Sequence, residues 1–383
     1  MNLFQELSGD ALQELDDFEH ILQKTLKPRA SHLKDLPSNI AELSYILTEG
    51  RDELARPYWS EARLKSAYLW YFMPWNLVRL APLLAGLPVN LKDGDNILDL
   101  GSGPLTMPLA LWLARPDLRK IALTFRCNDV HLTPLQSGLT LFNSLAGTSS
   151  AWRIELHKGS VREALQKAKP HKPTLISALN VLNEIRPGRK QGLADLLQGM
   201  IVDMRAALTP EGSLLLIEPG NRLGGKIIEL ARQIALKQKF SAISPCPHNL
   251  ECPMFSPNLK TWCHFVEENP QSPAWLSRLS ITAGLAKTRT ALSFVLLDAK
   301  EDVRDNTGPK PATLGKPGGL DGRVVSNSFK VPGQPGMCRY ACTKAGLALV
   351  PGAAKFVSGS LLCLKSGGNS FDSKTGALIA TPI

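Results

Sequence analysis

The sequence predicts an α/β protein whose centre is a doubly wound parallel sheet, with helices before the sheet and a small β module after it. Strand-like and helix-like patterns alternate from Leu91 to about residue 300, which is typical of a parallel sheet with crossover helices. Within this region, Asn96–Thr106 combines a buried strand, a turn of small residues and the start of a helix. Beyond residue 320, short apolar runs are separated by Gly and Pro turns, as in small β modules.

These patterns divide the 383 residues into four parts. We expect an N-terminal helical cap at 1–90, an α/β domain at 91–300 with a cysteine-rich insertion at 244–265, a linker at 301–320, and a β module at 321–383. The linker is rich in Gly and Pro and cannot bury a core, so we expect it to be mobile.

Composition and charge narrow the class of protein. Lys and Arg number 44 against 34 for Asp and Glu, a net charge of +10 that favours a polyanionic partner such as RNA. The best apolar run, 67–78, is short and broken by Pro74, so no membrane span is expected. Acidic residues in the first twenty positions argue against a signal or transit peptide and predict a cytoplasmic protein. The seven cysteines then indicate thiols or metal ligands rather than disulfides.

A small-residue loop follows the first predicted strand. Gly101 and Gly103 let the backbone turn sharply and approach a ligand, and the helix after them offers free N–H groups. The dinucleotide fingerprint requires a third glycine where this chain has Thr106, and Asp99 is not part of that fingerprint, so nicotinamide binding is disfavoured. The pattern instead resembles motif I of class I methyltransferases that use S-adenosylmethionine. This resemblance implies that Asp99 contacts the amino-acid part of the cofactor and that Gly101, Ser102 and Gly103 line it.

Two further strand ends face the predicted cofactor cleft. Asp129 ends the second strand, 26 residues after Gly103, where its carboxylate can accept hydrogen bonds from both ribose hydroxyls of an adenosine cofactor. Asn180 ends the fourth strand, where methyltransferases keep their chemistry. Enzymes that methylate exocyclic amines usually have Asp or Asn followed by Pro-Pro and an aromatic residue, and only Asn180 matches. This segment also lacks the cysteine nucleophile of cytosine-C5 enzymes, so no catalytic residue is assigned. Asn183 and Glu184 either hold a substrate or cap the next helix.

The cysteine-rich insertion is a candidate metal site. Cys246, Cys252 and Cys263 fall within 18 residues, among prolines that hold the backbone extended. A fourth ligand would come from Cys338 or Cys342. Four thiolates suit either a structural zinc or an iron-sulfur cluster, and the spacing does not choose between them.

The other cysteines and the nearby histidines are assigned different roles. His248 and His264 can either replace a thiolate as ligands or donate hydrogen bonds to the thiolates that bind. Cys127 and Cys363 sit in apolar, strand-like surroundings and are predicted to be packed core thiols.

Five short motifs carry a more specific resemblance: Leu98–Thr106, Asn180–Glu184, Ile217–Gly220, Cys246–Pro253 and Trp262–Phe265. Together they resemble the methyltransferase-like proteins of the small ribosomal subunit, which are mitochondrial small-subunit assembly proteins and their bacterial relatives. The likeness runs from about Tyr58 to the C-terminal strands.

The resemblance implies a ligand set for the metal site. According to this resemblance, a four-iron, four-sulfur (4Fe-4S) cluster is held by Cys246, Cys252, Cys263 and Cys342. The family's fourth cysteine precedes a short segment and a glycine, as Cys342 precedes Thr343–Gly346.

These observations lead to one main functional hypothesis and two alternatives. The main hypothesis is a protein that binds S-adenosylmethionine and an iron-sulfur cluster, and that acts in modification of small-subunit ribosomal RNA or in maturation of a preribosomal particle. The alternatives are an RNA-binding assembly factor without transferase activity, and a small-molecule methyltransferase whose positive charge is incidental.

Overall fold

The computed structural model describes residues 2–50, 58–185, 191–255, 259–268, 270–300 and 319–383. Most of the predicted linker at 301–320 therefore lies outside the described residues. The chain forms two compact units. We call Gln5–Ala164 with Glu268–Thr290 the N-terminal unit, and Met1–Phe4 with Leu165–Glu267 and Ala291–Ile383 the C-terminal unit.

The larger sheet confirms the predicted α/β class. Its strands are β1 Asn96–Leu100, β2 Leu123–Asp129, β3 Trp152–Lys158, β4 Leu175–Leu179, β5 Ser213–Pro219, β6 Ser241–Ser244, β7 Phe265–Glu268 and β8 Arg289–Asp298. They form one sheet in the order β3-β2-β1-β4-β5-β8-β6, and β7 pairs with β8 outside this path. β1 runs parallel to β2 and β2 to β3, whereas β8 runs antiparallel to both β5 and β6. This sheet keeps the order 3-2-1-4-5 of doubly wound folds through β5, and the strand beside β5 is reversed.

Helices make up most of the N-terminal unit outside its strands. They are α1 Gly9–Asp16, α2 Phe18–Leu26, α3 Ala30–Thr48, α4 Ala62–Ala67, α5 Met73–Gly86, α6 Thr106–Ala114, α7 Leu132–Ala146 and α11 Ala274–Thr282, with α8 Val161–Ala168 at the boundary between the units. Every residue of α6 is buried, because its sequence is apolar on all sides. α5 packs along α6 and shares this core. The aromatic residues Trp59, Trp70, Tyr71 and Trp75 are buried as well.

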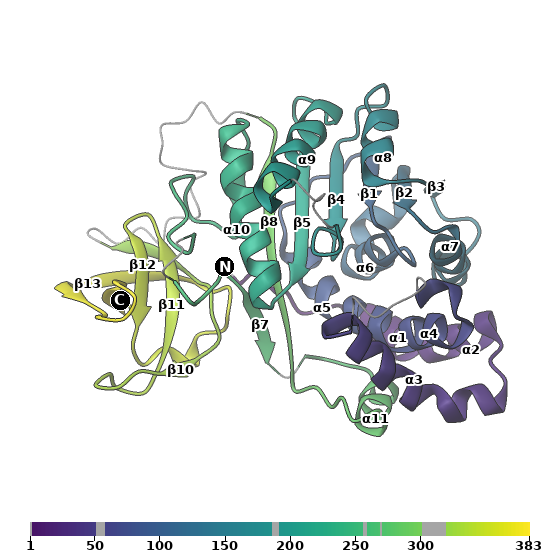
Figure 1. The fold of residues 1–383 in the computed structure, drawn as a ribbon, viewed down its shortest axis with the longest axis horizontal. Coiled ribbons are helices and arrows are strands. Elements are labelled where there is room, and N and C mark those ends of the chain that lie inside the picture. The colour runs from purple at the N-terminus through teal and green to yellow at the C-terminus, as the bar shows by residue number, and fades with distance from the viewer. Residues whose placement is uncertain (1, 51–57, 186–190, 256–258, 269, 301–318) are drawn as a thin grey trace. The chain divides into compact units, whose positions relative to one another are not determined.

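Two long helices accompany the strands of the C-terminal unit. α9 spans Leu193–Ala207 and α10 spans Arg222–Lys237, and both lie alongside β5 in the ribbon (Figure 1). α10 begins at an N-cap, Asn221, whose side-chain oxygen accepts a hydrogen bond of 2.9 Å from the N–H of Gly224. One face of this helix supports the cysteine-rich insertion.

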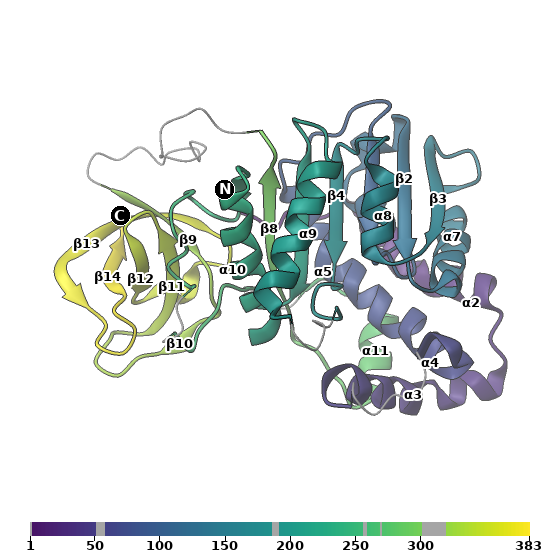
Figure 2. The ribbon, with the colours of Figure 1, turned by 45° about the horizontal axis from the view of Figure 1, so that its top comes forward.

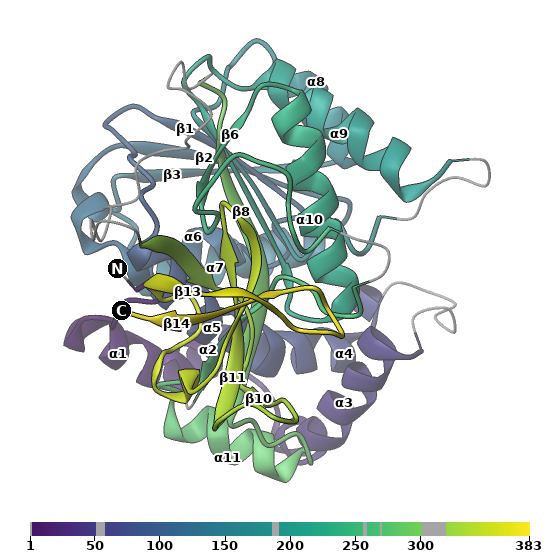
Figure 3. The same cartoon turned by 90° about the vertical axis from the view of Figure 1, so that its left-hand side faces the viewer.

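The C-terminal β module is a closed barrel. Its strands are β9 Leu320–Val324, β10 Phe329–Lys330, β11 Met337–Thr343, β12 Gly346–Val350, β13 Leu361–Phe371 and β14 Leu378–Pro382. Their order is β10-β11-β12-β14-β13-β9, and β9 also pairs with β11, so that five strands close on themselves (Figure 2 and Figure 3). Small and branched side chains fill the interior, among them Val324, Ala341, Ala348 and Leu364. The sequence did not predict β14 or the closure.

Among the described residues, none of the helices combines the length and the apolar composition that crossing a bilayer requires.

Lys287 is an exposed residue of the N-terminal unit whose ammonium group lies against two aromatic rings. Its Nζ lies 5.1 Å from the ring centre of Tyr71 and 4.9 Å from that of Trp75. Desolvation, followed by the charge of Arg79, lowers the pKa of Lys287 to about 8. Attraction to the aromatic faces therefore compensates only part of the lost hydration.

We predict that Lys287 makes stability depend on pH. Because the folded-state pKa lies below the unfolded one, the unfolded chain binds more protons between pH 8 and about 10.4, and stability should rise with pH in that window. Lys287→Met should be more stable than the wild type at pH 7, and this advantage should shrink as pH rises past 8. Urea unfolding of both proteins from pH 7 to pH 10 measures the difference, and parallel pH profiles would contradict the prediction.

Candidate functional site

The loop after β1 has the conformation that its glycines predict. Gly101 and Gly103 have φ of 63° and 51°, values that residues with a side chain rarely adopt. A Cβ at Gly103 would meet nothing within 4 Å, so the space beside it is open. On the other side α7 packs closely, since a Cβ at Gly138 would lie 2.3 Å from the carbonyl carbon of Pro104. α7 thus supports the loop, and the space beside Gly103 is open.

Hydrogen bonds from Ser102 fix this loop to the sheet. Its hydroxyl donates to the carbonyl of Asp99 at 2.8 Å, and its N–H donates to the carbonyl of Asn128 at 2.8 Å. Asp99 is almost fully buried and lies opposite Cys127 in the pairing of β1 with β2. Burial, followed by the charge of Asp99, raises the pKa of Cys127 well above its usual range. Cys127 is therefore a packed core thiol, as predicted, and Cys363 is also buried.

Asp129 turns its carboxylate toward the same loop. Oδ2 accepts a hydrogen bond from the N–H of Gly103 at 3.1 Å, and Oδ1 accepts one from the N–H of His131 at 2.9 Å. Burial raises the pKa of Asp129, while these backbone donors act in the opposite direction. Each carboxylate oxygen has a second lone pair, so the group can also accept hydrogen bonds from hydroxyls of a ligand.

The turn after β4 is held by the end of β5. Asn180 has a left-handed φ of 55°, and its N–H donates to the carbonyl of Ile217 at 2.8 Å. The fully buried Glu218 accepts a hydrogen bond from the N–H of Leu182 at 2.9 Å. Asn180 belongs to the C-terminal unit, whereas Asp99, Gly101, Ser102, Gly103 and Asp129 belong to the N-terminal unit.

The structure excludes one of the two hypotheses for Asn183 and Glu184, that they cap the next helix. Among the described residues the next helix, α9, has Gly192 as its N-cap, so neither side chain caps it. A substrate contact remains the hypothesis for this pair.

The four cysteines named by the family resemblance influence one another. The charges of Cys246 and Cys252 raise the pKa values of both Cys263 and Cys342, after burial as the largest cause. Cys338, the other candidate, instead feels the charge of Asp372. Geometry agrees for Cys342, whose sulfur lies 3.4 Å from Nε2 of His248 in the insertion. Even so, no three His, Cys, Asp or Glu side chains of the described residues are placed to hold a single metal ion.

A buried arginine on α10 anchors the first part of the insertion. Arg232 donates through Nε to the sulfur of Cys246 at 3.0 Å, and through Nη2 to the carbonyls of His248 and Leu250 at 2.8 Å and 3.0 Å. Burial opposes its charge, but the charges of Cys246 and Cys252 together with the sulfur contact outweigh burial and raise the pKa of Arg232. Nothing in the local sequence singled out this residue.

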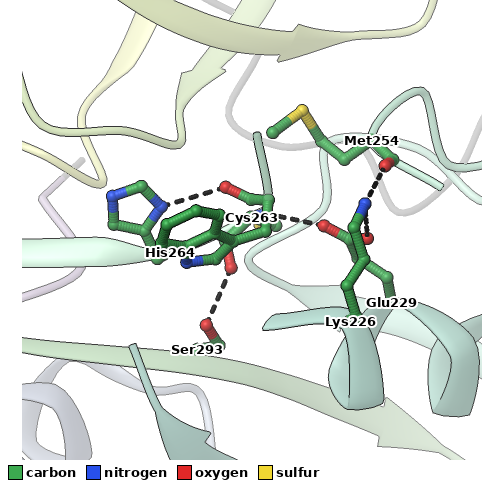
Figure 4. Close-up of polar contacts among 7 residues, drawn as sticks. Lys226, Glu229, Met254, Cys263, His264 and Ser293 are labelled. Carbon is green, nitrogen blue, oxygen red and sulfur yellow. Dashed lines mark hydrogen bonds and ion pairs between the residues drawn. The ribbon is translucent and has the colours of Figure 1, made fainter. Parts of the chain in front are cut away.

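An ion pair on the same helix anchors the second part (Figure 4). Lys226 Nζ lies 2.8 Å from Glu229 Oε2 and donates to the carbonyl of Met254 at 2.8 Å. Glu229 Oε1 accepts a hydrogen bond from the N–H of Cys263 at 2.7 Å, and the hydroxyl of Ser293 donates to the carbonyl of Cys263 at 2.8 Å. Lys226, Glu229 and Arg232 are spaced three apart, so one face of α10 holds both parts of the insertion.

Trp262 packs into a gap on α10 that a glycine provides. Its indole N–H donates to the carbonyl of Gly220 at 2.9 Å. A Cβ at Gly225 would lie 2.3 Å from Cδ1 of Trp262, so only glycine leaves room for the ring. Gly225 is therefore required by packing, although glycine is unfavourable inside a helix.

The two histidines differ in their relation to the thiols. His248 is buried with Nε2 3.4 Å from the sulfur of Cys342, and burial, followed by the charge of Arg232, lowers its pKa to about 4. It is thus a neutral neighbour of the thiol at pH 7. His264 instead contacts the carbonyl of Trp262 at 2.9 Å and Asn327 at 3.3 Å.

A second, half-buried arginine reaches the insertion from the barrel. Arg323 on β9 donates to the carbonyl of Pro245 at 3.1 Å and to that of Gly359 at 2.8 Å. Burial lowers its pKa, and the charges of Cys246 and Cys342 counteract that effect. Two arginines from separate elements therefore face the same group of thiols.

Comparison with known families supports the resemblance. Residues 140–294 match the family model described as mitochondrial small ribosomal subunit Rsm22. The resemblance predicted from the motifs is thus confirmed over this range. The range includes Cys246, Cys252 and Cys263, but not the loop after β1 or Cys342.

Solved structures similar to this chain include several methyltransferases. A putative class I S-adenosylmethionine-dependent methyltransferase from Listeria monocytogenes is 13% identical, with 79% of this chain and 91% of that chain covered and a TM-score of 0.40. A putative sarcosine dimethylglycine methyltransferase from Galdieria sulphuraria is 14% identical, with 65% and 92% covered and a TM-score of 0.32. Fibrillarin from Aeropyrum pernix, solved with natively bound S-adenosylmethionine, is 14% identical, with 58% and 76% covered and a TM-score of 0.32. Among curated proteins, none matches this sequence.

We predict that Gly225→Ala destabilises the protein by about 1–3 kcal/mol, because the methyl group would overlap the Trp262 ring. Gly199→Ala is the matched control, since Gly199 is also inside a helix but a Cβ there meets nothing within 4 Å. That control should be neutral or stabilising by up to about 1 kcal/mol. Urea unfolding monitored by tryptophan fluorescence compares the two variants, and equal effects would contradict the packing argument.

Proposed function

We propose that this protein binds S-adenosylmethionine at the loop after β1 and a 4Fe-4S cluster at Cys246, Cys252, Cys263 and Cys342, and that it acts on the small ribosomal subunit as an rRNA methyltransferase. One observation carries the proposal above the others. Cys342 follows Cys263 by 79 residues in the chain, yet its sulfur lies 3.4 Å from Nε2 of His248 in the insertion, and the insertion lies in the part that matches the small-subunit family.

The proposed cofactor site uses the open loop and Asp129. The loop N–H groups and the N-terminus of α6 suit the carboxylate of the methionine part, and Asp129 suits the ribose hydroxyls. Asp99 and Asn180 are assigned to the cofactor by the methyltransferase resemblance. When bound, S-adenosylmethionine supplies an activated methyl group, and the protein's contribution would be to hold the acceptor in line with it.

Four thiolates suit either an iron-sulfur cluster or a zinc ion, and the family resemblance is what favours the cluster. Either assembly is anionic, and the buried Arg232 and the half-buried Arg323 would balance that charge.

A second candidate is an assembly factor that binds RNA without transferring a methyl group. The turn after β4 favours this second candidate. Asn180 is the only residue there that matches a known methylation motif, and the carboxylate of the nearby Glu218 accepts a hydrogen bond from the backbone N–H of Leu182.

Transfer of labelled methyl groups to small-subunit RNA distinguishes this factor from the enzyme. Transfer to metabolite extracts but not to RNA would indicate a small-molecule methyltransferase.

We predict that Asp129→Asn weakens S-adenosylmethionine binding roughly tenfold or more, because hydrogen bonds to a charged group contribute about 1.5–3 kcal/mol. Isothermal titration calorimetry measures the affinity, and thermal unfolding checks that the variant is folded. Asp203→Asn on α9, which removes a carboxylate that belongs to the C-terminal unit and not to the unit of the loop, should bind like the wild type. Unchanged affinity in Asp129→Asn would contradict the proposed ribose contact.

We predict that Cys342→Ser loses the metal whereas Cys338→Ser keeps it. Both cysteines lie on β11 and are buried, so the pair controls for the loss of a packed thiol. Anaerobic purification followed by an absorption spectrum and by iron, sulfide and zinc analysis gives the readout. The wild type and Cys338→Ser should be brown, with near-stoichiometric iron and sulfide. Zinc without sulfide would replace the cluster by a zinc site, and absence of any metal would overturn both.

A further inference from the structure

The barrel has the connectivity of an oligonucleotide-binding fold. In chain order its five closing strands are β9, β11, β12, β13 and β14, and their spatial order is first-second-third-fifth-fourth, closed back to the first. The third and fifth strands are parallel, with Ala348 opposite Leu378, and the other pairs are antiparallel. A short helix, Ala353–Lys355, sits between the third and fourth strands and places Ala353 in the core. Five-stranded Greek-key barrels of this type bind oligonucleotides or oligosaccharides on the second and third strands, between the 1–2 and 4–5 loops.

In this chain those two loops meet on the outer face of β11. Ala341 points into the barrel, so Tyr340 and Cys342 face outward. The Tyr340 ring lies 4.7 Å from the ring of Phe329 in the 1–2 loop. Tyr340 also interacts with Thr375 and Asp372 of the 4–5 loop. The Cys342 end of the same face is occupied by the insertion, through His248.

Each loop offers an aromatic ring followed closely by a lysine. Phe329 and Lys330 lie in the 1–2 loop, and Phe371 and Lys374 lie at the 4–5 loop. The Phe371 side chain is 57% exposed, and both lysines are exposed. The one acid between them, Asp372, accepts a hydrogen bond from the N–H of Thr375 at 3.0 Å and so shapes the turn.

The charge of the barrel indicates which of these two classes of ligand it binds. Between residues 319 and 383 the sequence has seven Lys and Arg against two Asp and no Glu. Its five lysines are exposed, whereas Arg339 is buried and Arg323 is directed to the insertion. A neutral oligosaccharide would not need this excess of exposed positive charge, whereas a phosphate backbone is attracted to it. An exposed aromatic ring close to a lysine, as at Phe371, suits unpaired bases, which offer a free face for stacking, better than a closed duplex.

We propose that the barrel binds single-stranded RNA, with bases stacked on Phe371 and Phe329 and phosphates at Lys330 and Lys374. This site deepens the proposed small-subunit function, on which it rests for the choice of RNA over DNA. The barrel topology and its charge carry the binding itself.

The test is fluorescence anisotropy of the full chain with a labelled single-stranded 12-nucleotide RNA and with the matching duplex. Stacking contributes about 1–3 kcal/mol per base, so Phe371→Ala should weaken single-strand binding about 5- to 150-fold. Lys374→Ala should lower the slope of log affinity against log salt by about 0.7, the value for one phosphate contact on a single strand. Val357→Ala and Lys355→Ala are matched controls, since both positions are exposed and belong to the segment between the third and fourth strands rather than to the two loops, and they should leave affinity unchanged.

Iron content and S-adenosylmethionine affinity measured on the same preparations separate this proposal from the previous one. A protein that carries its cofactors but binds no single-stranded RNA overturns the barrel site alone. RNA binding that Phe371→Ala and Lys374→Ala leave intact, or a preference for the duplex, overturns it as well. If all preparations lack metal but still bind RNA, that result would contradict the cluster and not the barrel site.

Discussion

The buried guanidinium of Arg232 is the interaction on which the cysteine-rich part of this protein depends. A guanidinium removed from water is stable only where its N–H groups find acceptors and its charge finds anions. Arg232 finds acceptors within the insertion, at the sulfur of Cys246 and at two backbone carbonyls. Leaving one partner of such a buried pair alone typically costs about 3–5 kcal/mol. α10 and the first cysteine segment therefore stabilise each other, and Lys226 with Glu229 extends this support to the second segment.

The barrel shares in this arrangement through one strand. β11 brings Cys342 to the insertion, and β9 brings Arg323 beside the same thiols. A cluster bound by all four cysteines would tie the barrel to the insertion, so that metal binding and packing of the barrel would be linked. Tyr340, at the edge of the proposed RNA site, lies two residues before Cys342 on the same face, about 7 Å along the strand. RNA contact and cluster would then be neighbours on a single strand.

The sequence by itself determined the features whose causes are local. Strand, turn and helix followed from hydrophobic pattern and from glycine, and the positive φ of Gly101 and Gly103 is the conformation that their missing side chains allow. The burial of Cys127 followed from its apolar neighbours in β2. Three candidate thiols were evident because they fall within a short span of the chain. Each of these conclusions needed only residues close to one another in sequence.

Tertiary structure decided what depends on distant segments. Cys338 and Cys342 are four residues apart on one face of β11. Packing of the barrel on the insertion places Cys342 beside His248, whereas the fold of the barrel itself brings Cys338 near Asp372. The polar side chains of α10 have the spacing of ordinary surface charges, and Arg232 is buried only because the insertion covers it. Barrel closure likewise requires β9 to pair with β11 and β13. Such pairings are set by long-range packing and by the need to satisfy buried polar groups, which no local pattern records.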